Sequence, residues 1–349
     1  MLQTDSGRRY IVLFQKQEQV RVRAALMELG IIINQELTLI GGFVCQLPQV
    51  QVQTVAQLDG VDWLGLDLPV KTMNRLFEPI PWGVRRLKAP EFWPISTGKG
   101  VRVGILDTGV NLRHPDLRRN LTDGTNLLNP GEPPEDDNGH GTHVAGIIAA
   151  AADNQGVVGV APDAVIVPIK AFNTQGESTV SQIVLGIEWA LANKVQILNM
   201  SFGTGQASLP LLRAIRIAYK QGLIMVAASG NSGRSDQVDF PAGYYGVLGV
   251  GAVDYNDTIA EFSRGGYGLD LVAPGVGIRS TYLNEGYTDL SGTSMAAAHI
   301  SGVAAIILAK EPHLSPNQIF DLLTEAAIQL DGIAASRQGA GIPELTRLL

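Results

Sequence analysis

Short apolar runs rich in Val, Ile and Leu alternate with longer amphipathic segments from residue 101 onward. The runs predict strands and the longer segments predict helices. Apolar strands separated by helices are typical of a parallel sheet that is covered on both faces, with ligand sites at the carboxyl ends of the strands. The predicted strands are 101–106, 165–171, 195–200, 223–228 and 246–253, and the predicted helices are 140–151, 180–192, 209–221, 294–310 and 316–327.

The first 70 residues carry a different pattern, which predicts a small α+β domain. Its elements follow the order β-α-β-β-α-β, which is that of a ferredoxin-like module. Cys45 lies within an apolar run there, and we interpret it as a core residue. The predicted strands are 10–14, 31–33, 37–47 and 61–68, and the predicted helices are 17–29 and 52–58.

Residues 71–98 separate the two patterns. Four prolines, Pro79, Pro81, Pro90 and Pro94, punctuate this stretch, which indicates a linker or an extended lead-in. We therefore expect two domains, at residues 1–76 and 77–349.

Composition narrows the classes of function. The chain has 349 residues, of which 45% are apolar, and a formal net charge of −7 without a basic run. This balance argues against nucleic acid or an anionic membrane as the main partner. The single cysteine excludes an intrachain disulfide, and no apolar run reaches the ~18 residues of a membrane helix. The polar first nine residues show no signal peptide, so we expect a cytoplasmic protein, or a secreted one if a signal peptide has been removed.

Asp107 directly follows the first predicted strand of the α/β region. An acid at the carboxyl end of a buried strand stands where sites form in such sheets. Two other interpretations remain open for this residue alone. It could stabilise its own loop, or the strand and its glycine turn could bind a nucleotide, although no G-x-G-x-x-G opens a helix here.

His140 opens a predicted helix of small residues, which would hold its imidazole in a fixed place. His140 and His143 could instead bind zinc, but no glutamate follows the first histidine and no third ligand is evident. We expect His143 and His299 to be internal structural histidines. His114 is expected in a loop and His313 on the surface.

Asn231 follows a strand in a glycine-rich turn, and Ser294 stands where a glycine-containing turn meets a helix. The Asn231 amide could donate to a developing oxyanion, or asparagine could simply tolerate the turn. The hydroxyl of Ser294 would be open, and its backbone N–H would be an unpaired helix donor. The alternative is that Ser294 is only an N-cap.

Three segments in this order resemble the signature blocks of the subtilisin-like serine proteases. They are residues 103–109 (VGILDTG), 140–146 (HGTHVAG) and 292–296 (GTSMA). The resemblance runs from about Pro81 to the C-terminus, and the order Asp, His, Ser is one known for a protease triad on an α/β fold. It implies the subtilisin-like fold, a parallel sheet with helices on both faces.

The resemblance also implies a role for each motif residue. Asp107 would orient the imidazole of His140, which would act as general base and then general acid. Ser294 would attack the scissile carbonyl, and Asn231 with the Ser294 N–H would hold the oxyanion. The substrate would pair with Ser201, Phe202 and Gly203 and with Gly176 of the opposite edge. The pocket for the residue before the scissile bond would also be lined by Ala228, Ser229 and Gly230, which implies a preference for large apolar residues.

A structural calcium ion is a further implication of the resemblance. The side chains of Asp116 and Asp153 would be ligands, and the carbonyls of Ala151, Gln155 and Val157 would complete an oxygen set that suits Ca²⁺. A loop without metal is the alternative. The N-terminal module resembles the inhibitory propeptide of this family, so its own propeptide is an expected partner beside protein or peptide substrates. Self-cleavage is expected near Leu76 and Phe77.

Two classes of function follow. The first is a serine endopeptidase made as a self-inhibited zymogen. The second is a non-hydrolytic protein on the same fold, either a transpeptidase or peptide ligase or an inert binding scaffold. The family usually has proline where this chain has Ala298, and a widened site there could favour ligation.

Overall fold

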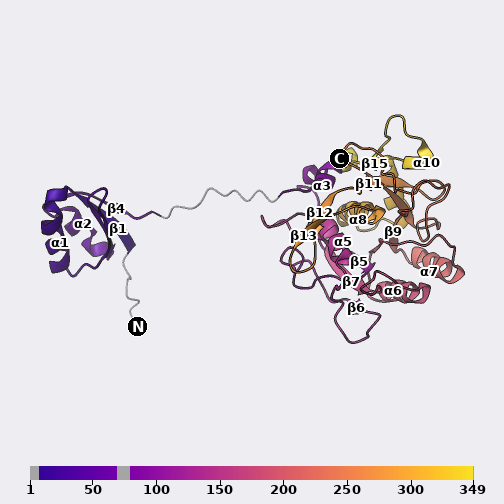
Figure 1. Ribbon diagram of the computed structural model, residues 1–349, viewed down its shortest axis with the longest axis horizontal. Helices are drawn as coiled ribbons and strands as arrows, with labels where there is room; N and C mark the ends of the chain where they lie inside the picture. Colours follow the sequence, from indigo (N-terminus) through magenta and orange to yellow (C-terminus); the bar gives the residue numbers. More distant parts are fainter. Residues whose placement is uncertain (1–7, 69–78, 349) are drawn as a thin grey trace. The chain divides into compact units, whose positions relative to one another are not determined.

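The computed structural model describes residues 8–68 and 79–348. The chain divides into two compact units, residues 1–75 and 76–349 (Figure 1). The expected self-cleavage site at Leu76 and Phe77 lies outside the described residues.

The predicted element order of the N-terminal unit is confirmed, but two strand bounds are wrong: the strand predicted at 31–33 is Ile33–Leu37, and the strand predicted at 37–47 begins only at Gly42, after a turn. The antiparallel sheet of this unit has the strand order β2-β3-β1-β4. Cys45 is fully buried in β3, as predicted, and burial raises the pKa of its thiol to about 11, so the thiol stays protonated. The elements are β1 (Arg8–Phe14), α1 (Gln19–Glu28), β2 (Ile33–Leu37), β3 (Gly42–Leu47), α2 (Val52–Ala56) and β4 (Val61–Leu66).

The second unit is built on a seven-stranded parallel sheet of order β11-β10-β9-β8-β5-β7-β6. The five predicted strands are confirmed within two residues at each end. The two edge strands were not predicted, because two and four residues are too few to carry a periodic signal. The strands are β5 (Arg102–Asp107), β6 (Thr125–Asn126), β7 (Val165–Lys170), β8 (Ile197–Met200), β9 (Ile224–Ala228), β10 (Leu248–Val253) and β11 (Leu271–Pro274).

Helices cover both faces of this sheet, as the fold-class prediction required. Side chains of β5 alternate between two apolar clusters: Ile105 belongs to the cluster with α5 and α8, and Leu106 to the cluster with α6 and α7. Figure 1 shows α8 crossing the middle of the unit. The predicted helices are confirmed as α5 (His140–Ala149), α6 (Val180–Ala192), α7 (Leu209–Lys220), α8 (Thr293–Lys310) and α9 (Pro316–Glu325).

Helix α8 is long and apolar enough to cross a membrane by composition, which the sequence reading did not anticipate. However, 89% of it is buried within the unit, so it is the central core helix of this fold.

The prediction of a linker or an extended lead-in over residues 71–98 is partly wrong. Residues 82–92 form two short helices, α3 (Trp82–Arg86) and α4 (Ala89–Phe92), and Phe92 is fully buried. Arg86 pairs with Asp257 at 2.8 Å and with Glu344 at 2.6 Å, which ties this segment to distant parts of the unit. The remaining short elements are β12 (Ile278–Thr281), β13 (Tyr287–Leu290), β14 (Ala327–Ile328), α10 (Ala335–Gln338) and β15 (Ile342–Pro343).

The four histidines other than His140 lie where they were expected. His143 and His299 are fully buried, and burial lowers the pKa of each to about 4, so both are neutral near pH 7. His114 is in a loop and also fully buried, and His313 is exposed.

Candidate active site

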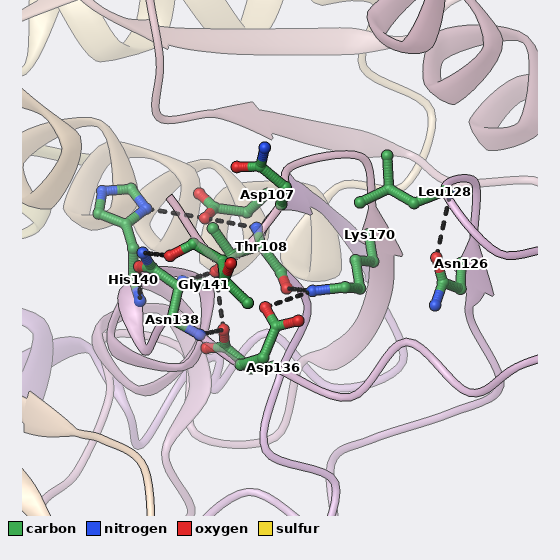
Figure 2. Close-up of polar contacts among 12 residues, drawn as sticks. Asp107, Thr108, Asn126, Leu128, Asp136, Asn138, His140, Gly141 and Lys170 are labelled. Atoms are coloured by element: carbon green, nitrogen blue, oxygen red, sulfur yellow. Dashed lines mark hydrogen bonds and ion pairs between the residues drawn. The ribbon is translucent and has the colours of Figure 1, made fainter. Parts of the chain in front are cut away.

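Asp107 and His140 meet where β5 ends and α5 begins. His140 Nδ1 lies 2.8 Å from Asp107 Oδ1, and the Thr108 N–H donates to the same oxygen at 2.8 Å (Figure 2). The Asp107 side chain is only 4% exposed. A buried carboxylate accepts, so Nδ1 carries the proton and Nε2 is left as a base.

The start of α5 is fixed by a second buried carboxylate, Asp136. Its Oδ1 accepts from Thr108 Oγ1 at 2.8 Å and from the Gly139 N–H at 2.9 Å, and its Oδ2 accepts from the Thr142 N–H at 2.9 Å. Thr108 Oγ1 in turn accepts from the Gly141 N–H at 3.0 Å. Since Thr108 directly follows Asp107, these bonds hold the turn before His140 against the end of β5 (Figure 2).

Lys170 is a buried cation at the same edge of the sheet. It is the register partner of Asp107 in the parallel pair β5 and β7. Its Nζ donates to the Thr108 carbonyl at 2.6 Å and pairs with Asp137 at 2.7 Å. Sequence reasoning missed the roles of Asp136 and Lys170. A lysine that ends an otherwise apolar strand was the available signal, because such a buried cation requires a partner.

The electrostatics of this cluster act on the imidazole. Burial opposes protonation of His140, but the charge and hydrogen bond of Asp107, with the charge of Asp136, outweigh burial and raise the pKa of His140.

The zinc interpretation finds no support in the geometry. His143 Nε2 lies 2.9 Å from the Ile278 carbonyl, and the described residues contain no group of three or more His, Cys, Asp or Glu able to hold a metal.

Ser294 is the second residue of α8, whose N-cap is Gly292, so the N-cap interpretation is wrong. Its N–H is one of the first of the helix, which have no intrahelical acceptor. Its hydroxyl donates to the Ser201 carbonyl at 2.9 Å, and no hydrogen bond to His140 is present among the described residues. Ser201 and His140 nevertheless line one pocket of about 350 Å³, so the Ser294 hydroxyl is hydrogen-bonded to a residue of the pocket that the imidazole borders.

Asn231 is oriented by Thr293, the neighbour of Ser294. Its Oδ1 accepts from the Thr293 N–H at 3.0 Å and from Thr293 Oγ1 at 2.9 Å, which leaves its exposed NH₂ group to donate elsewhere. The sharp turn is made by Gly230, with φ of 110°, whereas Asn231 is absent from the positive-φ residues of the described chain. Tolerance of turn geometry therefore does not explain this asparagine.

The residues expected to line the substrate cleft come from 201–203 after β8, from the loop at Gly176, and from a further segment, 228–230, at the end of β9; only the first two line the pocket that contains His140. Ser201, Phe202, Gly203 and Gly176 line the pocket that contains His140, and none of these four lies in a regular strand. On the other segment, Ala228 ends β9, Ser229 is fully buried, and the Gly230 N–H donates to Thr293 Oγ1 at 3.2 Å.

Asp116, in the loop after β5, and the loop after α5 together contain groups that fit a calcium ion. Asp116 Oδ1 is buried and has no hydrogen-bond partner among the described residues, while Oδ2 accepts from the Val157 N–H at 2.9 Å. Burial raises the pKa of Asp116, and the nearby charge of Asp153 adds to this effect. The Ala151 N–H donates to the main-chain carbonyl of Asp116 at 2.8 Å, so the start of this loop is also tied to the Asp116 backbone. A Cβ on Gly156 would lie 2.1 Å from Asp116 Oδ2, which explains the glycine.

Comparisons of the sequence with known proteins identify its family. The sequence profile of the subtilase family matches residues 98–341. M-protease of Shouchella clausii strain KSM-K16 is 43% identical over 272 residues, which cover 77% of this chain and 70% of that protein. Subtilisin Savinase of Lederbergia lenta is 44% identical over 255 residues, 72% of this chain and 93% of that protein. Alkaline elastase YaB of Bacillus sp. strain YaB is 44% identical over 266 residues, 76% of this chain and 68% of that protein.

Proposed function

The chain belongs to the subtilase family of serine proteases, and we propose that it hydrolyses peptide bonds through Asp107, His140 and Ser294. The observation that carries the proposal is the 2.8 Å hydrogen bond that His140 Nδ1 donates to the buried Asp107 carboxylate, which leaves Nε2 as the base. Ser294 at the start of a helix, beside the pocket that His140 lines, supplies the nucleophile.

The proposed reaction proceeds in two halves. His140 Nε2 takes the proton of the Ser294 hydroxyl as Oγ bonds to the scissile carbonyl carbon. Asp107 stays ionised and stabilises the imidazolium, which then gives its proton to the leaving amine as the C–N bond breaks. Water repeats the sequence on the acyl-enzyme with His140 again as base. The Asn231 NH₂ group and the Ser294 N–H would donate to the oxyanion in both halves.

The substrate would lie extended between Gly176 and the segment Ser201–Gly203. Main-chain pairing of this kind supplies affinity without sequence preference, and pockets for side chains supply specificity. We propose that the residue before the scissile bond is large and apolar and enters between the segments 201–203 and 228–230.

We further propose that the N-terminal unit is an inhibitory propeptide that the protease removes. Its ferredoxin-like element order and its division from the catalytic unit as a compact unit of its own support this role. It lies outside the residues that match the subtilase profile. Relatives named alkaline proteases also favour the secreted alternative over a cytoplasmic location, because the cytoplasm does not provide an alkaline working pH.

We retain hydrolysis over the alternatives of ligation and an inert scaffold. Every residue of the proposed catalytic set is present, which an inert scaffold would not require. Ala298 is fully buried within α8, and that helix runs unbroken from Thr293 to Lys310, so no irregularity at its start supports a widened site.

We propose that calcium, when bound, stabilises the loop after α5. Asp116 and Asp153 would contribute side-chain oxygens, and Ala151, Gln155 and Val157 would contribute carbonyls. The ion would neutralise two neighbouring carboxylates and take no part in the reaction.

The first prediction concerns rate and pH. The general base must be neutral, so activity falls as pH drops through the His140 pKa, and a raised pKa moves this fall above the ordinary imidazole value of about 6.5.

Asn231→Leu should lower kcat by about 10²–10³-fold with little change in KM, as expected for loss of one oxyanion donor.

Steady-state kinetics on a chromogenic peptide from pH 5 to 10 would measure both effects. The exposed Asn129→Leu serves as the control and should match the wild type. Unchanged kcat in Asn231→Leu would contradict the assigned oxyanion role.

The second prediction concerns maturation. Wild-type protein should shorten on incubation, with a new N-terminus near Phe77, whereas Ser294→Ala should stay at full length because the nucleophile is missing. Intact mass measurement and N-terminal sequencing would follow the reaction. Equal shortening of both proteins would refute self-cleavage.

The third prediction concerns calcium. In the Ser294→Ala background, calcium at about 100 times its Kd should stabilise the fold by about 2.7 kcal/mol and raise Tm by about 5 °C or more. Asp116→Asn should lose this response, while the exposed Asp123→Asn should keep it. Calorimetry with calcium and with chelator tests the site, and an identical Tm under both conditions would disprove it.

A further inference from the structure

Asp239 and Arg264 form an ion pair beside the two segments that we assign to the residue before the scissile bond. Arg264 Nη1 lies 2.7 Å from Asp239 Oδ1, and the two side chains are 21% and 14% exposed. Arg264 also donates to Ser232 Oγ at 3.1 Å and to Ser235 Oγ at 2.7 Å. The guanidinium is therefore held in one orientation against the carboxylate.

Main-chain hydrogen bonds attach both members of the pair to the segment 228–230. The Asp239 N–H donates to the Ser229 carbonyl at 2.9 Å, and the Arg264 N–H donates to the Gly230 carbonyl at 3.0 Å. Ser229 Oγ donates back to the Arg264 carbonyl at 2.9 Å.

The Asp239–Arg264 pair also lies next to the second segment, residues 201–203. Thr204, which follows Gly203, exchanges two main-chain hydrogen bonds of 2.8 Å with Phe240. A Cβ on Gly203 would lie 2.8 Å from Asp239 Cβ, and a Cβ on Gly230 would lie 2.3 Å from Asp239 Oδ2. The Asp239 side chain thus packs against both segments, next to the two glycines.

We propose that the Asp239–Arg264 pair determines the charge of the side chain that this protease accepts immediately before the scissile bond. This inference rests on the proposed function and refines its specificity. Arg264 neutralises the carboxylate, so the site takes an uncharged residue and rejects lysine, arginine, aspartate and glutamate.

The physical basis is the cost of removing an unpaired charge from water. A substrate ammonium or carboxylate would be desolvated beside two charges that already satisfy each other, and it would gain no partner in return. If one member is removed, the other becomes a counter-charge for the substrate. Arg234 and Asp236 belong to the same loop but are exposed, so solvent screens them.

Three variants and four matched peptides test this. Arg264→Gln, Asp239→Asn and the double variant are assayed on peptides that differ only in Phe, Leu, Lys or Glu before the scissile bond. Arg264→Gln should raise the Lys-to-Phe ratio of kcat/KM by about tenfold or more, since it exposes a carboxylate to the substrate. Asp239→Asn should raise the Glu-to-Phe ratio, and the double variant should raise neither.

Each ratio is taken on one enzyme preparation, so partial misfolding of a variant cancels. Arg279→Gln is the control, because it breaks the exposed Arg279–Asp289 pair with the same change of charge. Ratios in Arg264→Gln and Asp239→Asn that equal those of wild type and Arg279→Gln would overturn this inference alone. Failure of the wild type to cleave any of the four peptides would overturn the proposed function and this inference with it.

Discussion

The hydrogen bond between Asp107 and His140 is the contact on which the function depends. It joins the last residue of a buried strand to the first residue of a helix, so its length is set by how β5 and α5 pack. Because the carboxylate is nearly inaccessible to water, its charge is weakly screened and acts on one imidazole nitrogen. A base with a fixed tautomer and a raised pKa results directly from that placement.

Packing of small residues makes this placement possible. Helices α5 and α8 lie on the same face of the sheet, and both carry glycines where another segment approaches closely. A Cβ on Gly146 would lie 2.3 Å from Thr281 Oγ1, and one on Gly302 would lie 2.6 Å from Val160 Cβ. The starts of α5 and α8 carry His140 and Ser294, so contacts far from the chemistry fix the positions of the reacting groups.

Periodicity and motif reasoning recovered the long elements and the candidate site. Val- and Ile-rich runs and helices of ten or more residues have a strong periodic signal, whereas β6 and the short helices α3 and α4 do not. The partners in the polar network around Asp136 and Lys170 could not be derived, because a lysine at the end of an apolar strand indicates only that it needs a partner, and a carboxylate in a loop does not indicate which atoms it meets. The Asp239–Arg264 pair is a similar case, since its members are 25 positions apart and adjoin only through tertiary hydrogen bonds.

A covalent label on the nucleophile tests the central claim most directly. The account requires that the buried Asp107 carboxylate make His140 a base able to activate Ser294. Mass spectrometry after treatment with a fluorophosphonate should therefore find one adduct, on the peptide that contains Ser294, and should find none in the His140→Ala variant. An unlabelled protein, or an adduct on another serine that persists without His140, would contradict the account.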